Sequence, residues 1–258
     1  MNTVTQPRVV RSEWTKLHSL RSSRITLLVA VGLVVGLGLL IPLVSVSNWK
    51  PHTPTAGYDA VSRSLGGIYL AQLAFGVLGV LLVTGEYTTG MIRATFAAVP
   101  KRLRVLWAKL GVFGAITLIL GTVACVIAFI GGQAIFASKH VDAGLGDPGV
   151  LRAVLGAGLF LGGIGALGVG LGALIRNSAG AIATLTGLLF VVPVIVSALP
   201  QSWSESIGKY LPGNAGTAII LTHPSPDSLG PWTGLGILGV WAAVAVALAA
   251  VMLIRRDV

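Results

Sequence analysis

Six apolar stretches constrain this chain more than any other feature of its sequence, because each is long enough to cross a lipid bilayer. A transmembrane helix needs about 20 mostly apolar residues to cover a hydrocarbon core about 30 Å thick. The stretches are 25–46, 65–83, 110–130, 151–175, 179–199 and 232–254. They predict an all-α polytopic membrane domain of six transmembrane helices over residues 25–254.

The amino-acid composition excludes soluble domains and disordered chains. Apolar residues make up 54% of the sequence and charged residues only 10%, whereas an ordinary soluble domain has about 25% charged residues. A soluble fold of 258 residues could not cover its surface with so few charges. A disordered chain would be rich in charge and poor in aliphatic residues. The protein is therefore predicted to be an integral membrane protein.

Positive charge is distributed unevenly between the two sides of the predicted membrane domain. One side receives the N-terminal segment, the connections after the second and fourth spans, and the C-terminus. It carries 13 of the 18 lysines and arginines but only 3 of the 8 acidic residues, so the whole net charge of +10 lies there. Because positively charged loops stay in the cytoplasm, both termini are predicted to be cytoplasmic. The positive charge on this side is then expected to contact anionic lipid headgroups. No nucleic-acid partner is predicted.

A basic segment, residues 1–24, precedes the first span. The residues that recur there at helical spacing are Val10, Trp14, Leu17 and Arg21. Arg11 and Lys16 lie beside them and add positive charge. A basic amphipathic helix with a tryptophan on its apolar side is typical of the membrane interface. The segment is therefore predicted to be an interfacial helix in contact with membrane lipids.

The sequence lacks the motifs of catalysis and of nucleotide binding. It has no Gly-x-x-x-x-Gly-Lys-Ser/Thr loop, no His-Glu-x-x-His and no Gly-x-Ser-x-Gly. Its one cysteine, Cys125, excludes a cysteine-based zinc site, and no other metal site is predicted. Because the interiors of the predicted spans hold no ionisable residue, an autonomous ion-coupled carrier is disfavoured. No enzymatic activity is predicted, and any energy for transport must come from a partner.

Glycine and proline mark two spans. The fourth span contains two glycine pairs with a spacing of four, Gly158/Gly162 and Gly168/Gly172. Such pairs allow close helix packing, but a composition rich in Ala, Gly and Val also produces them by chance. Pro193 is expected to kink the fifth span, because proline removes one backbone donor. Beyond it, Ser204–Pro212 is predicted to form a short helix.

The connection between the second and third spans, residues 85–109, is the most informative segment. Thr88 or Thr89 is a candidate cap for a short helix over Met91–Ala98, which Pro100 would end. Such a helix places Ile92 and Phe96 on one strip. Exposed apolar residues of this kind need a cover, either a membrane surface or a partner protein.

This connection resembles the signature region of ABC-2 type permeases, the membrane subunits of a class of bacterial ABC exporters. The matching positions are Glu86, Tyr87, Gly90, Arg93, Pro100, Arg102 and Lys109. The basic N-terminal segment and the six-span layout are similar to the family over essentially the whole chain.

The resemblance implies a function and a mechanism. Thr89–Ala98 would form a cytoplasmic coupling helix that docks on a separate ATPase subunit, with Phe96 or Ile92 as its apolar anchor. Glu86 and Arg93 would orient the segment through charge pairs; in a simpler interpretation Glu86 only pairs with Arg93 or a neighbouring arginine, and Pro100 only ends a helix. ATP and magnesium would be bound by the partner, and this chain would hold no cofactor.

The resemblance also implies the setting in which the chain works. Two copies, or this chain and a related permease, would pair in the bacterial plasma membrane, with the substrate path along the interface beside the second and fifth spans. The segment between the last two spans would cap the bundle or re-enter the membrane. Two alternatives stay open: a membrane anchor or immunity protein that does not transport, and, with less support, an autonomous secondary carrier.

Overall fold

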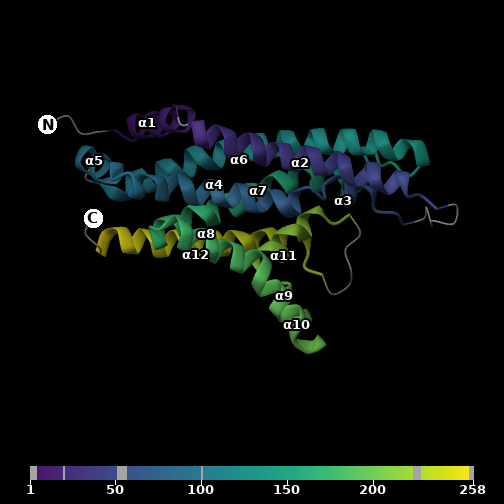
Figure 1. The fold of residues 1–258 in the computed structure, drawn as a ribbon. Coiled ribbons are helices and arrows are strands. Elements are labelled where there is room, and N and C mark those ends of the chain that lie inside the picture. Colours follow the sequence, from purple (N-terminus) through teal and green to yellow (C-terminus); the bar gives the residue numbers. More distant parts are fainter. Residues whose placement is uncertain (1–4, 20, 51–56, 100, 223–227, 256–258) are drawn as a thin grey trace.

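Six long apolar helices, arranged side by side, make up most of the chain (Figure 1). The computed structural model describes residues 5–19, 21–50, 57–99, 101–222 and 228–255, in which all regular structure is helical. The spans lie in α2 (Arg21–Ser47), α4 (Ile68–Thr88), α6 (Arg102–Phe136), α7 (Val150–Ile175), α8 (Ser178–Thr186) with α9 (Val192–Ser197), and α12 (Pro231–Arg255). The predicted all-α architecture with six helices of spanning length is confirmed.

Shorter helices join the spans. They are α1 (Gln6–Ser19), α3 (Ala60–Ser64), α5 (Met91–Ala98), η1 (Ala137–Lys139), α10 (Gln201–Gly208), α11 (Pro212–Thr217) and η3 (Ala218–Ile220). Helices α1 and α5 and the end of α12 lie at the same end of the bundle (Figure 1). We call this the basic end, because the segments predicted to carry the net positive charge meet there.

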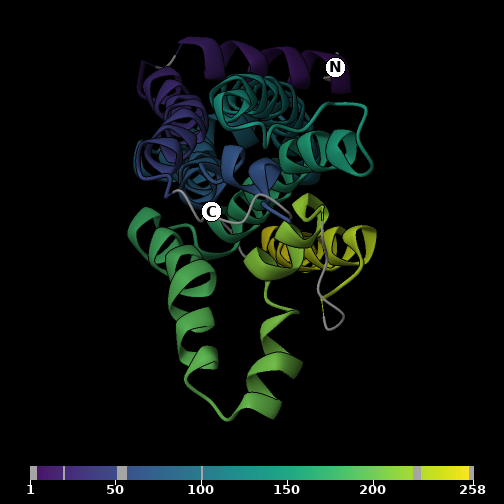
Figure 2. The same cartoon turned by 90° about the vertical axis from the view of Figure 1, so that its right-hand side faces the viewer.

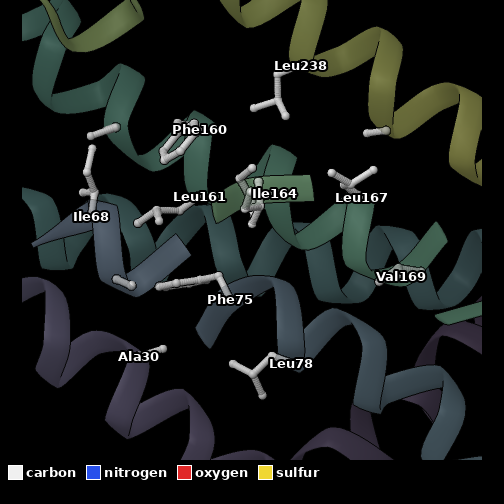
Figure 3. Packing of buried hydrophobic residues seen from close by; sticks show 14 of the residues in the cluster. Ala30, Ile68, Phe75, Leu78, Phe160, Leu161, Ile164, Leu167, Val169 and Leu238 are labelled. Carbon is white, nitrogen blue, oxygen red and sulfur yellow. The ribbon is translucent and has the colours of Figure 1, made fainter. Parts of the chain in front are cut away.

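Helix α7 is the centre of the bundle, since it packs against α4, α6 and α12. Large apolar side chains from these helices fill the space between them, among them Phe75, Phe160, Ile164, Leu167 and Leu238 (Figure 3). All five are at most 1% exposed. Because lipid tails are as apolar as these side chains, packing contacts rather than hydrophobic burial hold such helices together within a bilayer.

Glycines bring α4 and α7 into backbone contact. A Cβ atom added at Gly168 would collide with the carbonyl oxygen of Gly76, and one at Gly172 would lie 2.9 Å from the carbonyl oxygen of Val80. Gly158 faces Thr122 of α6 in the same way. Three of the four predicted glycines, Gly158, Gly168 and Gly172, thus lie at close contacts between helices. Gly162 does not lie at such a contact within the described chain, since an added Cβ meets nothing within 4 Å.

The helices that carry the second and third spans are longer than predicted. Helix α4 continues to Thr88 and α6 begins at Arg102, so Glu86 and Lys109 lie inside spanning helices rather than in a connection. The charges that end an apolar stretch do not end a helix, because Glu, Lys and Arg are good helix formers. Glu86 and Lys109 therefore lie on the helices that carry the second and third spans, beyond the ends of the predicted apolar stretches 65–83 and 110–130.

The fifth span is interrupted, as the position of Pro193 predicts. A π-helical turn, η2 (Gly187–Val191), separates α8 from α9, and Pro193 is at the start of α9. Because proline has no N–H to donate, the regular bonding pattern breaks at this point. Helices α9 and α10 then leave the bundle and form a hairpin beside it (Figure 2).

The chain returns to the bundle after this hairpin. Helix α10 ends at Gly208, and Pro212 begins α11 instead of ending a helix, which corrects the predicted helix over Ser204–Pro212. Proline suits the first turn of a helix, where its missing donor is not needed. Helix α11 and η3 are largely buried against α12 and α7.

Candidate functional site: a buried charge network at the basic end

Four charged side chains from three helices form a closed network, which we call the charge network. Glu13 and Lys16 come from α1, Glu86 from α4 and Lys109 from α6. The Nζ atom of Lys109 lies 2.7 Å from Oε2 of Glu13 and 2.6 Å from Oε1 of Glu86. The Nζ atom of Lys16 lies 2.7 Å from Oε1 of Glu13 and 2.8 Å from Oε1 of Glu86. Each lysine therefore bridges both carboxylates.

The charge network is buried, which makes its pairing obligatory. Glu13, Lys109 and Glu86 are only 1%, 3% and 5% exposed. A buried charge without a partner is strongly destabilising. Two carboxylates and two ammonium groups leave no net charge in the network. Its one open acceptor is Oε2 of Glu86, which receives no hydrogen bond from the described part of the chain.

Helix α1 lies across the basic end and passes over α6 (Figure 2). Its inward side carries Val9 and Glu13, which are 3% and 1% exposed. The predicted apolar strip points elsewhere: Val10 and Trp14 are 39% and 49% exposed. One face of α1 therefore faces the bundle with Val9 and Glu13, while Val10 and Trp14 of the predicted strip are on its more exposed side.

Lys16 keeps its charge in this setting. Burial alone would lower the pKa of Lys16, but the hydrogen bonds and electrostatic attraction of Glu13 and Glu86 outweigh it and raise the pKa above its ordinary value of 10.5. A raised pKa means that the contribution of Lys16 to stability is fully present below pH 10.5 and is lost only as the pH rises through the folded-state value. Lys16 is thus charged at neutral pH.

The short helix α5 adjoins the charge network. The hydroxyl oxygen of Thr95 lies 3.4 Å from Nζ of Lys16. The bounds Met91–Ala98 agree with the predicted helix, but its predicted threonine cap is wrong. Thr89 ends α4, with its hydroxyl donating to the carbonyl of Gly85, and Gly90 precedes α5 without a side-chain cap. Pro100, expected to end the helix, lies outside the described residues.

Gly90 sets the angle between α4 and α5, because its φ of +70° is in the left-handed region. We expect Gly90→Ala to destabilise this turn by about 1 kcal/mol, since a Cβ atom is strained in that conformation. No steric clash adds to this cost, because an added Cβ meets nothing within 4 Å. Thermal unfolding in detergent measures the effect. Gly85→Ala is the matched control: Gly85 is also open, yet helical, and this variant should be neutral or slightly stabilising.

Ile92 and Phe96 pack against other parts of their own chain. Ile92 is only 4% exposed, so the expectation of an exposed anchor is wrong at that position. Phe96 is half-buried, packs with Val9 and Val105, and has the Arg102 guanidinium 5.5 Å from its ring centre. The outward side of α5 carries Met91 and Arg93 instead. Helix α5 folds back on the bundle. The sequence does not reveal this, because an apolar strip on a helix does not show which element it packs against.

Two arginines fasten the end of α12 to this region. Arg102 donates to the carbonyl oxygen of Leu253 at 3.1 Å, and Arg176 donates to that of Met252 at 3.1 Å. Cations satisfy the free carbonyl groups at a helix C-terminus. The Arg176 guanidinium also lies 5.5 Å from the ring centre of Tyr87.

The structure brings only some of the predicted residues together. Glu86, Lys109 and Lys16 meet in the charge network, whereas Arg93 and Arg11 are exposed and lie outside it. The expected pairing of Glu86 with an arginine is wrong, since lysines fill that role. Glu13 and Arg176 are additional members of the region. The only local sequence feature that points to Glu13 is its spacing from Lys16, because residues three apart on a helix are neighbours on its surface.

Comparisons with known proteins identify no relative. No family model matches the sequence, and no curated protein matches it. Among the described residues, no group of three His, Cys, Asp or Glu side chains is arranged to hold a metal ion. The six spanning helices and the charge network are therefore the features that bear on function.

Proposed function

We propose that this multi-pass membrane protein is the permease subunit of an ATP-driven exporter of the ABC-2 type. The observation that carries the proposal is the charge network. It ties an N-terminal helix and two spans together beside a short helix at the basic end. The permease chain forms the path through the membrane, and a separate ATPase subunit binds ATP and magnesium.

The charge network suits the transmission of force from a partner to the spans. A partner that presses on α5 pushes on Thr95 and, through Lys16, on α1, α4 and α6 at once. Paired buried charges hold these helices at fixed distances, so they move together. Met91 and Arg93 form the contact surface for the ATPase, because they are the outward side chains of α5.

A second copy completes the path in this proposal. Beyond η2, α9 presents apolar side chains away from the bundle: Val194 and Ile195 are 68% and 59% exposed. Adjacent Val191 is 52% exposed. In this proposal the second copy packs on this exposed face of α9, where the helix leaves the bundle (Figure 2). The apolar character of this face suits hydrophobic or amphipathic cargo.

Purification from the native host in mild detergent, with ATP hydrolysis as readout, tests the proposal. We expect a near-stoichiometric ATPase to remain bound to the tagged chain. Arg93→Glu should abolish at least nine-tenths of the bound activity, about the effect of losing one charged contact, while the chain still inserts. Lys139→Glu, at the opposite end of the bundle, is the matched control and should retain the ATPase.

Three results would contradict the proposal. If the tagged chain purifies without an ATPase under conditions in which a control complex stays intact, the result would favour a membrane anchor. Loss of the ATPase in both variants would show that the contact is not at α5. Export by the reconstituted chain alone, driven by an ion gradient, would indicate an autonomous carrier.

A further inference from the structure

An apolar cavity of about 280 Å³ lies between α1, α2 and α6 at the basic end, with Leu78 of α4 also in its lining, and neither the charge network nor the outward face of α5 uses it. Trp14 and Leu17 of α1 line one side, and Phe113 and Ile116 of α6 line another. Nine of its ten lining residues are apolar, and the tenth is Arg24. The cavity is thus apolar except for one cationic side chain, that of Arg24.

The shape of the cavity suits a hydrocarbon chain that enters from the membrane surface. Its lining extends along α6 from Phe113 to Leu120, which corresponds to about 10 Å of helix. Trp14 and Leu17 in its lining belong to α1, the helix that crosses the end of the bundle (Figure 2). Its volume is close to the lower limit of about 300 Å³ for ligand pockets, enough for part of one acyl chain and too small for a whole lipid.

Arg24 supplies the charge that selects a headgroup. It is the first residue of the spanning part of α2, is exposed, and forms no ion pair with any described residue. A guanidinium at this level meets the phosphate layer of the bilayer and can bind a phosphate through two parallel hydrogen bonds. The net positive charge predicted for this side of the protein also attracts anionic headgroups.

We propose that the cavity is a binding site for one anionic phospholipid, with an acyl chain between α1, α2 and α6 and the phosphate on Arg24. The site is independent of the ATPase contact, because it faces the bilayer and involves other residues. A bound chain fills the space under Trp14 and Leu17 and so supports the position of α1. The lipid is then a structural ligand at the basic end.

Native mass spectrometry of the full-length protein tests the site, with phosphatidylglycerol and phosphatidylcholine of identical acyl chains as probes. We expect each chain to retain one phosphatidylglycerol and to bind phosphatidylcholine more weakly. Arg24→Gln should weaken phosphatidylglycerol binding about fivefold, the effect of one basic group at a membrane surface. Ala115→Trp, which fills the cavity, should abolish the retained lipid for both headgroups.

Matched controls separate a defined site from general attraction to lipid. Arg11→Gln removes an exposed arginine of α1 outside the cavity, and Val123→Trp adds a tryptophan on an exposed part of α6 away from it. Both should retain phosphatidylglycerol as the unmodified chain does. Equal retention of the two lipids, or an Arg11→Gln effect as large as that of Arg24→Gln, would overturn the proposal. So would lipid retention by a folded Ala115→Trp variant.

Discussion

Replacement of Lys109 by Met should destabilise the folded chain by about 3–5 kcal/mol, the cost of leaving buried charges without their partner. Lys109 is 3% exposed and bridges Glu13 and Glu86, so its loss leaves two buried carboxylates facing Lys16 alone. Unfolding in mixed micelles of increasing denaturing detergent measures the change. We also expect α1 to detach first, because Lys109 holds it to α6.

Two further variants identify the charge network as the cause. Arg93→Met removes an exposed basic residue of the same end and should change stability by less than about 0.5 kcal/mol. Combining Lys109→Met with Glu86→Gln restores charge balance and should recover part of the loss. A Lys109→Met variant as stable as the unmodified chain, or a double variant less stable than the sum of its single changes, would show that the pairing does not hold these helices.

Replacement of Gly168 by Val should cost about 3 kcal/mol or prevent correct folding, because the added atoms would meet backbone and not a movable side chain. A Cβ atom at this position collides with the carbonyl group of Gly76, so α4 and α7 would have to separate. The same denaturing-detergent titration measures the loss, and the yield of monodisperse protein is a second readout.

Gly162→Val is the control for that variant. Gly162 is on the same helix, six residues earlier, and an added Cβ meets nothing within 4 Å. Its replacement should leave stability within about 0.5 kcal/mol. If both valine variants were equally unstable, helix composition rather than close approach would explain the effect of Gly168→Val.

The number and order of the spans follow from sequence because the bilayer fixes the length of an apolar helix. The end of α5 also follows, since Pro100 comes after Val99 in the sequence and the residue before a proline avoids the helical conformation. In both cases the controlling interactions are local. The ends of α4 and α6 are harder to predict from the sequence, because hydropathy shows where the apolar stretch ends and not where the helix ends.

The candidate site is harder to read from sequence because its contacts are distant along the chain. Glu13 and Lys109 are 96 residues apart, and the side of α1 that faces α6 is not its most apolar side. The rotation of α7 about its axis likewise decides that Gly168 meets α4 while Gly162 stays open. Ile92 is misjudged for the same reason, since its burial depends on the fold of α5 against the bundle.

The charge network has a consequence for biosynthesis. Helix α1 leaves the ribosome before α4 and α6, which carry the partners that Glu13 and Lys16 have outside their own helix. Until both later helices have inserted, Glu13 and Lys16 must remain hydrated at the membrane surface. Helix α1 therefore docks on the bundle only after the third span has been made, although it precedes that span in the chain.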